Sequence, residues 1–363
     1  MKKWLLVLIM LVLVMPNKAR AIETSARCAI LMDTDSNRIM YAKNIHEVRS
    51  VASISKIMTA ILAIESGKLD DTVLIGDEIL DAYGSAIYIK PGEEMTLRDL
   101  VYGLMLRSGN DAALAIANYV GGDVDSFVDM MNKKTKEIGM KNTTFNNPSG
   151  LDEDKGNMST AYDMAILTSY AMQNEDYKKI VKTKHHTVTT NKNVYSWTNK
   201  NKLLTTYKYA TGGKTGYTEV ARRTLVSTAS KNGLNLVVVT LNDGNDFLDH
   251  KSLHEYAFEN YTNYYILKEG IINIYDETYY KNEELYLRNN FSYPLLETEK
   301  NSIKLKFELE QKRNFKENDA IGKVKVFIGD KQIYDTDVFV REKKIPKKLN
   351  FFQKIGKWFK DLW

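Results

Sequence analysis

Apolar positions recur with two different periods along the chain, and the change of period separates regions of different structure. Residues 27–33 and 38–44 are short apolar runs joined by turn-forming residues, which predicts an opening β-hairpin. From Ser53 onward, apolar residues lie three and four positions apart, which predicts a helix that ends at Gly67. Further helices are predicted at 100–109, 110–120, 124–140 and 159–172, with capping boxes at Thr96 and Thr160.

The next apolar runs have the pattern of central strands. Residues 223–230 and 234–242 flank a Lys-Asn-Gly turn, and the second run is nearly continuously apolar, which predicts adjacent antiparallel strands covered on both faces. Residues 246–265 predict a closing helix. Because strands from both ends of this region enclose a block of helices, we predict an α+β sandwich, an antiparallel sheet with helices on both faces.

Near Lys268 the pattern changes to short alternating segments without a helical stretch. This change predicts a small all-β domain over residues 268–342. The larger domain, with the length of a catalytic domain, then covers residues 22–267. Separate segments at 1–21 and 343–363 complete the predicted organisation.

The first 21 residues have the pattern of a secretory signal peptide. Lys2 and Lys3 precede an apolar run at 4–15, and Ala19 and Ala21 are the small residues of a cleavage site. The apolar run is short for a membrane-spanning helix. An uncleaved N-terminal anchor is the alternative interpretation. In either case we expect the body of the protein to lie outside the cytoplasm.

The last segment, residues 343–363, predicts an amphipathic helix. Its aromatic and aliphatic residues share one face, and Lys354, Lys357 and Lys360 lie toward the other. This arrangement is typical of a helix in a membrane interface, where anionic lipids attract the lysines. We therefore expect peripheral attachment to the outer face of the cell membrane. A helix docked on its own domain is the alternative.

Charge and cysteine content exclude some classes of function. The formal charge is +5, but the residues from Arg341 to Trp363 include eight basic and two acidic ones, and the signal peptide holds four more basic residues. The body from Ile22 to Val340 is therefore acidic, with a net charge of about −5, which argues against nucleic-acid binding. The single Cys28 excludes an internal disulfide, and we interpret it as a small buried apolar side chain.

Three short polar motifs occur in order, far apart in the sequence. Each is common by itself, but their order and their flanking residues argue against coincidence. If their order were a coincidence, Ser53 would be a helix cap, Ser108 to Asn110 a turn and Lys214 to Gly216 the end of a strand. The motifs are Ser53-x-x-Lys56, Ser108-x-Asn110 and Lys214-Thr215-Gly216.

The first motif places a hydroxyl and an amine side by side at the start of a helix. Serine is a weak nucleophile until a base removes its proton. None of the five histidines has a triad-like setting, so Lys56 is the nearby candidate base. Its ordinary pKa of about 10.4 must be lowered, which burial and a second cation achieve. We expect Lys214 to be that cation and also to bind an anionic end of the substrate.

We expect neither a metal nor another cofactor. The adjacent His185 and His186 are the one pair that suggests metal binding. Neighbouring residues on a strand point to opposite faces, and no further ligand lies at a suitable spacing.

The chain resembles the D-alanyl-D-alanine carboxypeptidases, the low-molecular-mass penicillin-binding proteins. The resemblance implies a β-lactamase/transpeptidase-like fold and an acyl-enzyme between Ser53 and the penultimate D-alanine of a peptidoglycan stem peptide. It implies that Lys56 is the general base and that Ser108 passes a proton toward the leaving amine. Asn110 would hold the substrate amide and the base. The similarity covers nearly the whole mature chain and includes residues 52–60, 104–113, 147–152, 159–165 and 212–218.

The same resemblance assigns the third motif to substrate binding. It implies that Lys214 and Thr215 bind the terminal carboxylate and that Gly216 lets the strand approach the substrate backbone. The backbone N–H groups of Ser53 and Tyr217 would form the oxyanion hole, in which one donor is typically worth about 3 kcal/mol.

Three positions depart from the usual pattern of this family. Val51 replaces a common proline, Ser55 replaces a common threonine, and residues 221–224 replace a segment that contains Ala-Gly. None is expected to touch the chemistry. We interpret Arg222 and Arg223 as solvated surface, with a role in recognising an anionic substrate as the alternative.

We therefore expect a secreted, membrane-associated serine D-Ala-D-Ala carboxypeptidase that trims peptidoglycan. β-Lactams, whose amide and carboxylate imitate the acyl-D-Ala-D-Ala end, would acylate it. A β-lactamase is a close alternative, although no Glu-x-x-Leu-Asn-like segment lies between the second and third motifs. A D,D-endopeptidase or transpeptidase differs only in leaving group or acceptor. A non-catalytic peptidoglycan-binding protein would have no reason to keep the complete motifs.

Overall fold

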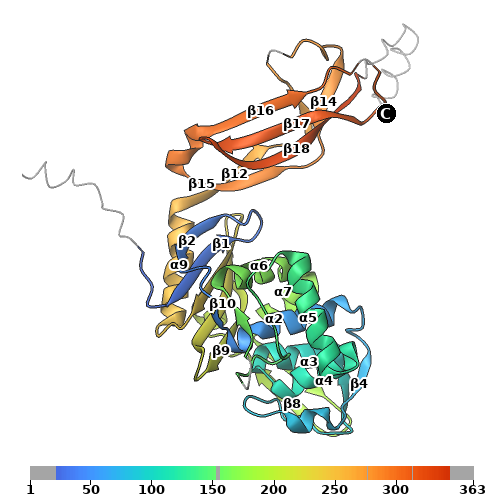
Figure 1. The fold of residues 1–363 in the computed structure, drawn as a ribbon, viewed down its shortest axis with the longest axis vertical. Helices are drawn as coiled ribbons and strands as arrows, with labels where there is room; N and C mark the ends of the chain where they lie inside the picture. The colour runs from blue at the N-terminus through green and yellow to red at the C-terminus, as the bar shows by residue number, and fades with distance from the viewer. Residues whose placement is uncertain (1–21, 153–155, 276, 313, 344–363) are drawn as a thin grey trace, which may run out of the picture. The chain divides into compact units, whose positions relative to one another are not determined.

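The computed structural model describes residues 22–152, 156–275, 277–312 and 314–343, which divide between Thr262 and Asn263 into two compact units (Figure 1). The expected signal peptide and all but the first residue of the expected amphipathic tail lie outside the described residues. Within the described ranges, no helix has the length and apolar content needed to cross a membrane.

The first unit is built on a five-stranded antiparallel sheet. The predicted N-terminal hairpin is confirmed as the first two strands, and the two predicted central strands are confirmed as antiparallel neighbours. The strands, in their spatial order, are β2 (Ile39–Lys43), β1 (Cys28–Asp33), β11 (Leu234–Leu241), β10 (Arg222–Lys231) and β9 (Ala210–Thr218).

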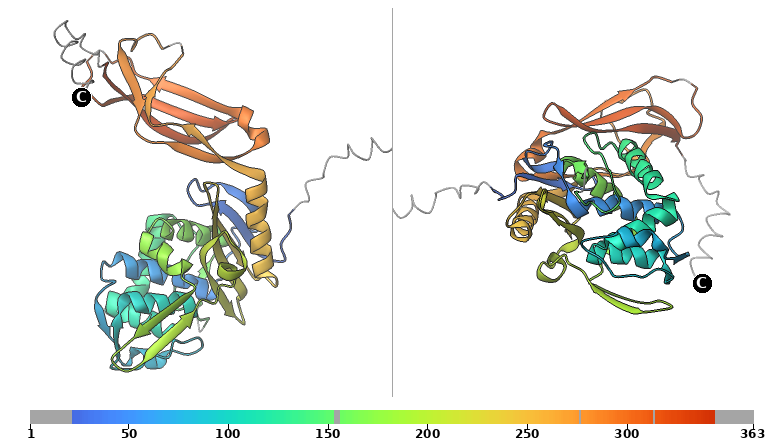
Figure 2. Two further views of the ribbon diagram at one scale, coloured as in Figure 1. Left: turned by 180° about the vertical axis from the view of Figure 1, so that it is seen from behind. Right: turned by 60° about the horizontal axis from the view of Figure 1, so that its bottom comes forward.

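Helices cover both faces of this sheet, as predicted. Because successive side chains of a strand point to opposite faces, Leu225 and Ala229 of β10 pack with Phe247 and Phe258 of α9 (Asp246–Asn260). Val226 joins the large core cluster on the other face, where α6 (Ala161–Ala171) contacts β1, β10 and β11. The two views of Figure 2 show α9 and the helical block on opposite sides of the sheet.

The closing helix is shorter than the sequence predicts. Residues 246–265 were expected to be helical, but α9 ends at Asn260 and the chain continues as strand β12 (Tyr261–Leu267). This strand is rich in tyrosine, threonine and isoleucine, which favour extended backbone. The helix therefore ends where the residues that favour extended backbone begin.

The helical block surrounds one buried helix. In α2 (Lys56–Glu65) every residue from Lys56 to Ile64 is buried, including its polar first residue. Thr96 and Thr160 cap their helices as predicted, each accepting from a backbone N–H three residues on, at 3.1 and 3.0 Å. The other helices of the block are α3 (Leu97–Tyr102), α4 (Asn110–Gly121), α5 (Val124–Ile138) and α7 (Glu175–Lys182).

Smaller elements connect these layers. The hairpin of β7 (His185–Thr189) and β8 (Val194–Thr198) was not predicted. His186 lies 2.7 Å from Asp99 and stacks on Tyr102, which explains this histidine without a metal. The remaining elements are β3 (Arg49–Ser50), β4 (Thr72–Leu74), β5 (Glu94–Thr96), β6 (Met158–Ser159), α8 (Leu203–Thr206), and the short helical turns Ala52–Ser55, Asp77–Asp81 and Gly103–Arg107.

The second unit is a small all-β domain, as predicted. Its antiparallel sheet encloses a core of branched aliphatic side chains that includes Ile321, Val324, Val326, Val338 and Val340. A single helical turn at Glu297–Ser302 interrupts the strands. The sheet has the order β13 (Gly270–Ile272), β14 (Glu283–Leu287), β18 (Lys331–Glu342), β17 (Asp319–Ile328) and β16 (Ile303–Leu309), and β12 pairs separately with β15 (Phe291–Leu296).

Candidate active site

Ser53 and Lys56 lie in adjacent turns of one continuous helical segment. Ser53 belongs to the tight turn Ala52–Ser55, and Lys56 is the first residue of α2. Because residues three apart face the same side of a helix, the Lys56 Nζ lies 3.1 Å from the Ser53 Oγ. The spacing of the first motif therefore produces a hydroxyl–amine pair in the fold.

The Lys56 amine is fully buried and has polar partners on two sides. It donates to the Oδ1 of Asn110 at 2.6 Å and to the backbone carbonyl of Ser149. Burial, together with the positive charge of Lys200, lowers the pKa of Lys56 to about 7, and the negative charge of Asp111 opposes part of this shift. A substantial fraction of this amine is therefore neutral near pH 7 and can accept a proton.

Asn110 is held in one orientation from both ends of its amide. Its Nδ2 donates to the carbonyl of Tyr83 at 2.5 Å, so its Oδ1 faces Lys56. Asn110 begins α4, and the next residue, Asp111, accepts from the backbone N–H groups of Ile87 and Tyr88. These contacts fix the start of the helix against a distant loop.

The carbonyl partner of Lys56 comes from a segment to which the sequence assigned no role. Asn147 accepts from the backbone N–H groups of Ser149 and Gly150, at 3.1 and 2.6 Å, which shapes a tight turn. Gly150 has a φ of +81°, and a side chain there would overlap the backbone of Ala52. The turn thus presses against the segment that carries Ser53.

Lys214 of β9 is a second buried lysine near the first. Its amine donates to the carbonyl of Thr215 at 2.7 Å. Burial is the main cause that lowers the pKa of Lys214 well below its usual value, and the positive charges of Lys56 and Lys200 add to this effect. The structure therefore brings together the two lysines that lie far apart in the sequence.

Gly216 allows β9 to lie directly against the segment of Ser53. A methyl group at Gly216 would overlap the Oγ1 of Thr224 and lie 3.1 Å from the backbone nitrogens of Ser53 and Ile54. The resemblance implied that this glycine makes room for a substrate. In the structure it makes room for the backbone of Ser53 itself.

These residues border one hollow of about 370 Å³. Ser53, Ser108, Thr215, Gly216 and Tyr217 line it, whereas Lys56, Asn110 and Lys214 are buried and do not form its wall. Ser108 has a left-handed backbone, with a φ of +68°. The other lining residues are Ser85, Lys200, Lys202, Arg223, Asp246 and Phe247.

The two arginines near the hollow both have acidic partners. Arg223 lines the hollow and pairs with Asp246 at 2.6 Å. Arg222 pairs with Glu219 at 2.9 Å at the exposed end of the strand. Sequence reasoning missed Lys200, an exposed residue that donates to Ser85 at 3.3 Å and contributes positive charge to the site. No sequence pattern predicts that a single surface lysine lies beside an active site.

Family models match both units. Residues 15–245 match the D-alanyl-D-alanine carboxypeptidase family, and residues 261–345 match the C-terminal domain of penicillin-binding protein 5. The first match covers more than half of the chain. The two matches correspond to the larger α+β unit and the all-β unit.

Curated relatives carry the same name. D-alanyl-D-alanine carboxypeptidase DacF of Bacillus subtilis is 38% identical over 220 residues, which are 59% of this chain and 56% of the relative. The chain thus spans little more than half the length of this relative. D-alanyl-D-alanine carboxypeptidase DacD of Escherichia coli is 30% identical over 335 residues, which are 86% of this chain and 84% of the relative.

Solved structures agree with the fold. Penicillin-binding protein 5 from Haemophilus influenzae is similar over 88% of this chain and 98% of its own, with a TM-score of 0.74 and 28% identity. The D-alanyl-D-alanine carboxypeptidase DacD from Francisella tularensis is similar over 89% of this chain and 95% of its own, with a TM-score of 0.69 and 28% identity. From these matches and the geometry of the site, the chain belongs to the D-alanyl-D-alanine carboxypeptidase family of serine peptidases.

Proposed function

We propose that the protein is a serine D-Ala-D-Ala carboxypeptidase that removes the terminal D-alanine from peptidoglycan stem peptides through an acyl-enzyme on Ser53. The observation that carries this proposal is the contact between the Ser53 hydroxyl and the buried Lys56 amine, 3.1 Å apart. Because burial lowers the pKa of Lys56 to about 7, the amine is able to take the serine proton at neutral pH.

The reaction proceeds in two steps. Neutral Lys56 accepts the Ser53 proton while Oγ attacks the carbonyl carbon of the penultimate D-alanine. The backbone N–H groups of Ser53 and Tyr217 stabilise the oxyanion. Protonated Lys56 gives this proton to the Ser108 hydroxyl, which passes a proton to the leaving amine of the terminal D-alanine as the peptide C–N bond breaks and the ester forms, so Lys56 is neutral again. Water then attacks the ester, neutral Lys56 accepts one of its protons and returns it to the Ser53 Oγ as the ester bond breaks, and the shortened peptide leaves.

Lys214 and Thr215 bind the carboxylate of the terminal D-alanine. Without a bound anion, burial and the neighbouring cations disfavour the charged form of Lys214. An incoming carboxylate supplies the opposite charge and favours protonation of this lysine. Lys214 therefore gains a charge partner when substrate binds, and Asn110 holds both Lys56 and the substrate amide. β-Lactams, which carry a carboxylate beside a reactive amide, are expected to acylate Ser53 in the same way.

The first test is turnover of a soluble stem pentapeptide that ends in D-Ala-D-Ala. The mature protein is expected to release one equivalent of D-alanine from each peptide, which an enzymatic D-alanine assay measures. After incubation with penicillin, mass spectrometry of a digest is expected to locate the adduct on the peptide that contains Ser53. No D-alanine and no adduct from folded protein would refute the proposal.

We propose further that residues 1–21 direct export and that residues 343–363 attach the protein to the outer face of the membrane. The lysines at the start of residues 1–21 and the Ala-x-Ala pattern at their end support export. The apolar face and the lysine-bearing face expected for residues 343–363 support attachment.

Deletion of residues 347–363 is expected to abolish sedimentation with anionic lipid vesicles while turnover of the soluble pentapeptide stays unchanged. The reason is that the deletion removes the apolar face and the lysines of the tail together. The full mature chain is the control in both assays. Undiminished vesicle binding by the shortened chain would show that the attachment lies elsewhere.

A further inference from the structure

One stretch of the first unit is basic throughout, although the body of the chain is acidic. Residues 177–218 contain nine lysines and no aspartate or glutamate. Lys56 and Lys214 account for the chemistry of the site, and Lys214 is the one buried lysine of this stretch. The function proposed above leaves the exposed lysines of the stretch unexplained. Lys200 lines the catalytic hollow and donates to Ser85. The other exposed lysines that line hollows are Lys179, Lys182, Lys184, Lys202 and Lys208, which we call the lysine track.

The lysine track follows three neighbouring hollows. The first, of about 450 Å³, lies between α7 and the sheet, and the second, of about 820 Å³, lies beside α8. Lys182 lines both. The third is the hollow of the candidate active site. Its Lys202 directly precedes α8, and Leu204 of that helix lines the second hollow.

Strand β9 links all three hollows. Ala210 lines the second, Thr211 the first, and Thr215 to Tyr217 the third. A strand advances about 3.3 Å per residue, so Thr211 and Thr215 are separated by about 13 Å. The track therefore begins within a short distance of Ser53 and leads away from it.

The ammonium groups of the track are available to a ligand. Among the described residues, Lys179, Lys182, Lys184 and Lys202 have no carboxylate within ion-pair distance, whereas Lys178 beside them pairs with Glu175 at 2.7 Å. The residues of the track are exposed. A group of exposed lysines without ion-pair partners is typical of a surface that meets an anionic partner.

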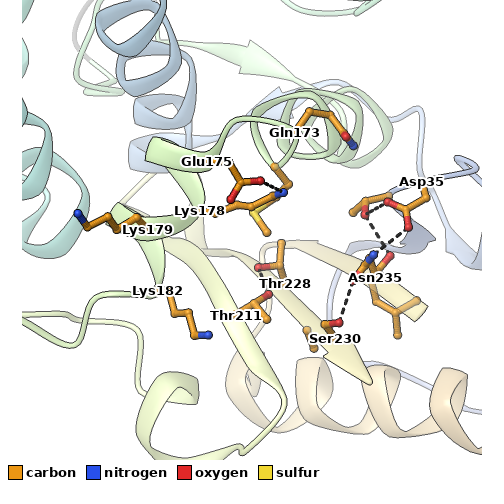
Figure 3. Close-up of a pocket in the computed structure, with 14 residues that line it drawn as sticks. Asp35, Gln173, Glu175, Lys178, Lys179, Lys182, Thr211, Thr228, Ser230 and Asn235 are labelled. Carbon is orange, nitrogen blue, oxygen red and sulfur yellow. Dashed lines mark hydrogen bonds and ion pairs between the residues drawn. The ribbon is translucent and has the colours of Figure 1, made fainter. Parts of the chain in front are cut away.

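The walls of the hollows also offer hydroxyl groups. Figure 3 shows Lys178 close to Glu175, Lys182 beside Thr211, and Thr211 next to Thr228, whereas the Lys179 side chain extends away from these residues. The second hollow adds two exposed threonines of α8. Asp35 and Glu175 also line the first hollow, and Glu175 is neutralised by its lysine partner. Such a surface suits a polymer that carries both anionic groups and amides or hydroxyls.

We propose that the lysine track holds the part of a peptidoglycan strand next to the stem peptide that is being cut. This inference rests on the proposed function. Each uncut stem peptide ends in a carboxylate, so a polymer strand presents a row of carboxylates beside the one in the active site. The track meets the catalytic hollow directly, which favours the polymeric substrate over an unrelated anion. Lysines, as compact point charges, suit such separated carboxylates.

The test compares a polymeric with a short substrate. The triple variant Lys179→Gln, Lys182→Gln, Lys184→Gln removes three charges of the track outside the catalytic hollow. On purified peptidoglycan freed of phosphate-containing wall polymers, we expect the variant to bind and to release D-alanine about tenfold less efficiently than the unmodified protein at low salt. On the soluble pentapeptide, both proteins are expected to have the same kcat/KM.

A matched variant controls for net charge. Lys133→Gln, Lys136→Gln, Lys141→Gln also removes three exposed lysines, and none of them lines the three hollows. It is expected to act like the unmodified protein on both substrates. Rising salt is expected to reduce the difference between the track variant and the unmodified protein, because exposed charges are screened within about 10 Å at 0.1 M ionic strength.

Four results would count against the proposal. Equal losses of activity on peptidoglycan in the track variant and the control variant would show that net charge alone causes the loss. Lysine-dependent binding only to walls that retain phosphate polymers would assign the track to those polymers instead. No turnover of the pentapeptide by the unmodified protein would refute the proposed function and with it this substrate. Normal pentapeptide turnover with equal rates on peptidoglycan for all proteins would refute only the role of the track.

Discussion

Replacement of Lys56 by methionine is expected to slow acylation of Ser53 by penicillin by about 10²–10⁴-fold at neutral pH, the range that a general base contributes. Methionine has nearly the length of the lysine stem and no basic group. The Ser53 hydroxyl then has no base within hydrogen-bonding distance, since Lys56 is its amine partner at 3.1 Å. Stopped-flow measurement with a chromogenic β-lactam gives the acylation rate.

The pH dependence of the same reaction separates a base from a merely structural residue. Burial lowers the pKa of Lys56 to about 7, and the amine acts as a base only when it is neutral. Acylation of the unmodified protein is therefore expected to rise as the pH increases through about 7 and to level off above it. In the Lys56→Met variant this inflection is expected to be absent.

Ser53→Ala is the control, because it removes the nucleophile and should form no adduct at any pH. Circular dichroism and the melting temperature report whether the Lys56→Met variant is folded. Methionine leaves the Oδ1 of Asn110 and the carbonyl of Ser149 without their donor, but it also removes an amine whose charged form is disfavoured by burial. Acylation within tenfold of the unmodified rate in a folded variant would exclude Lys56 as the base.

The second large loss of activity is expected from adding a single methyl group at Gly216. Gly216→Ala is expected to lower kcat/KM on the pentapeptide by about 10²-fold, the usual loss when an oxyanion donor is misplaced. The added methyl would lie 3.1 Å from the backbone nitrogens of Ser53 and Ile54 and would overlap Thr224. Backbone atoms cannot rotate away, so β9 and the nucleophile must move apart.

Gly244→Ala is a matched control for this substitution. A methyl group at Gly244 meets no atom within 4 Å, and its backbone does not need a positive φ. It is expected to leave kcat/KM unchanged. Because a displaced strand disturbs both the nucleophile and the carboxylate site, Gly216→Ala is expected to lower the rate of penicillin acylation as well. A normal acylation rate would show that the strand does not need this close approach.

Much of the fold could be predicted because the pattern is strong where burial is complete. The run that became β11 is apolar at six of its eight positions, as a strand covered on both faces requires. In β10 the buried Thr224, Ser227 and Thr228 interrupt the apolar residues, and the turn that leads to β11 supports its pairing. The end of α9 was predicted less well. This helix buries His250 and His254 against Ser227 among its apolar residues, so its hydrophobic period is weak. The tyrosines that follow Asn260 have no pattern that separates the helix from strand β12.

The polar side chains around Ser53 could be placed in one site because three motifs named them. The backbone carbonyl of Ser149 could not be found in the same way, because every residue carries a carbonyl and only the fold selects this one. The contact of Asp111 with the N–H groups of Ile87 and Tyr88 was also missed. It joins a helix to a loop, and no local pattern encodes such a pairing.

Strand β9 lies at an end of its sheet, with β10 as its one strand neighbour among the described residues. Outermost strands are a hazard, because a second molecule can pair with their free side and begin aggregation. Three of the nine residues of β9 are glycines and a fourth is the buried Lys214. Few side chains of this strand could therefore pack against the same strand of a second molecule. The composition of this end strand therefore discourages self-association, although only one of its sides is paired with another strand in the described residues.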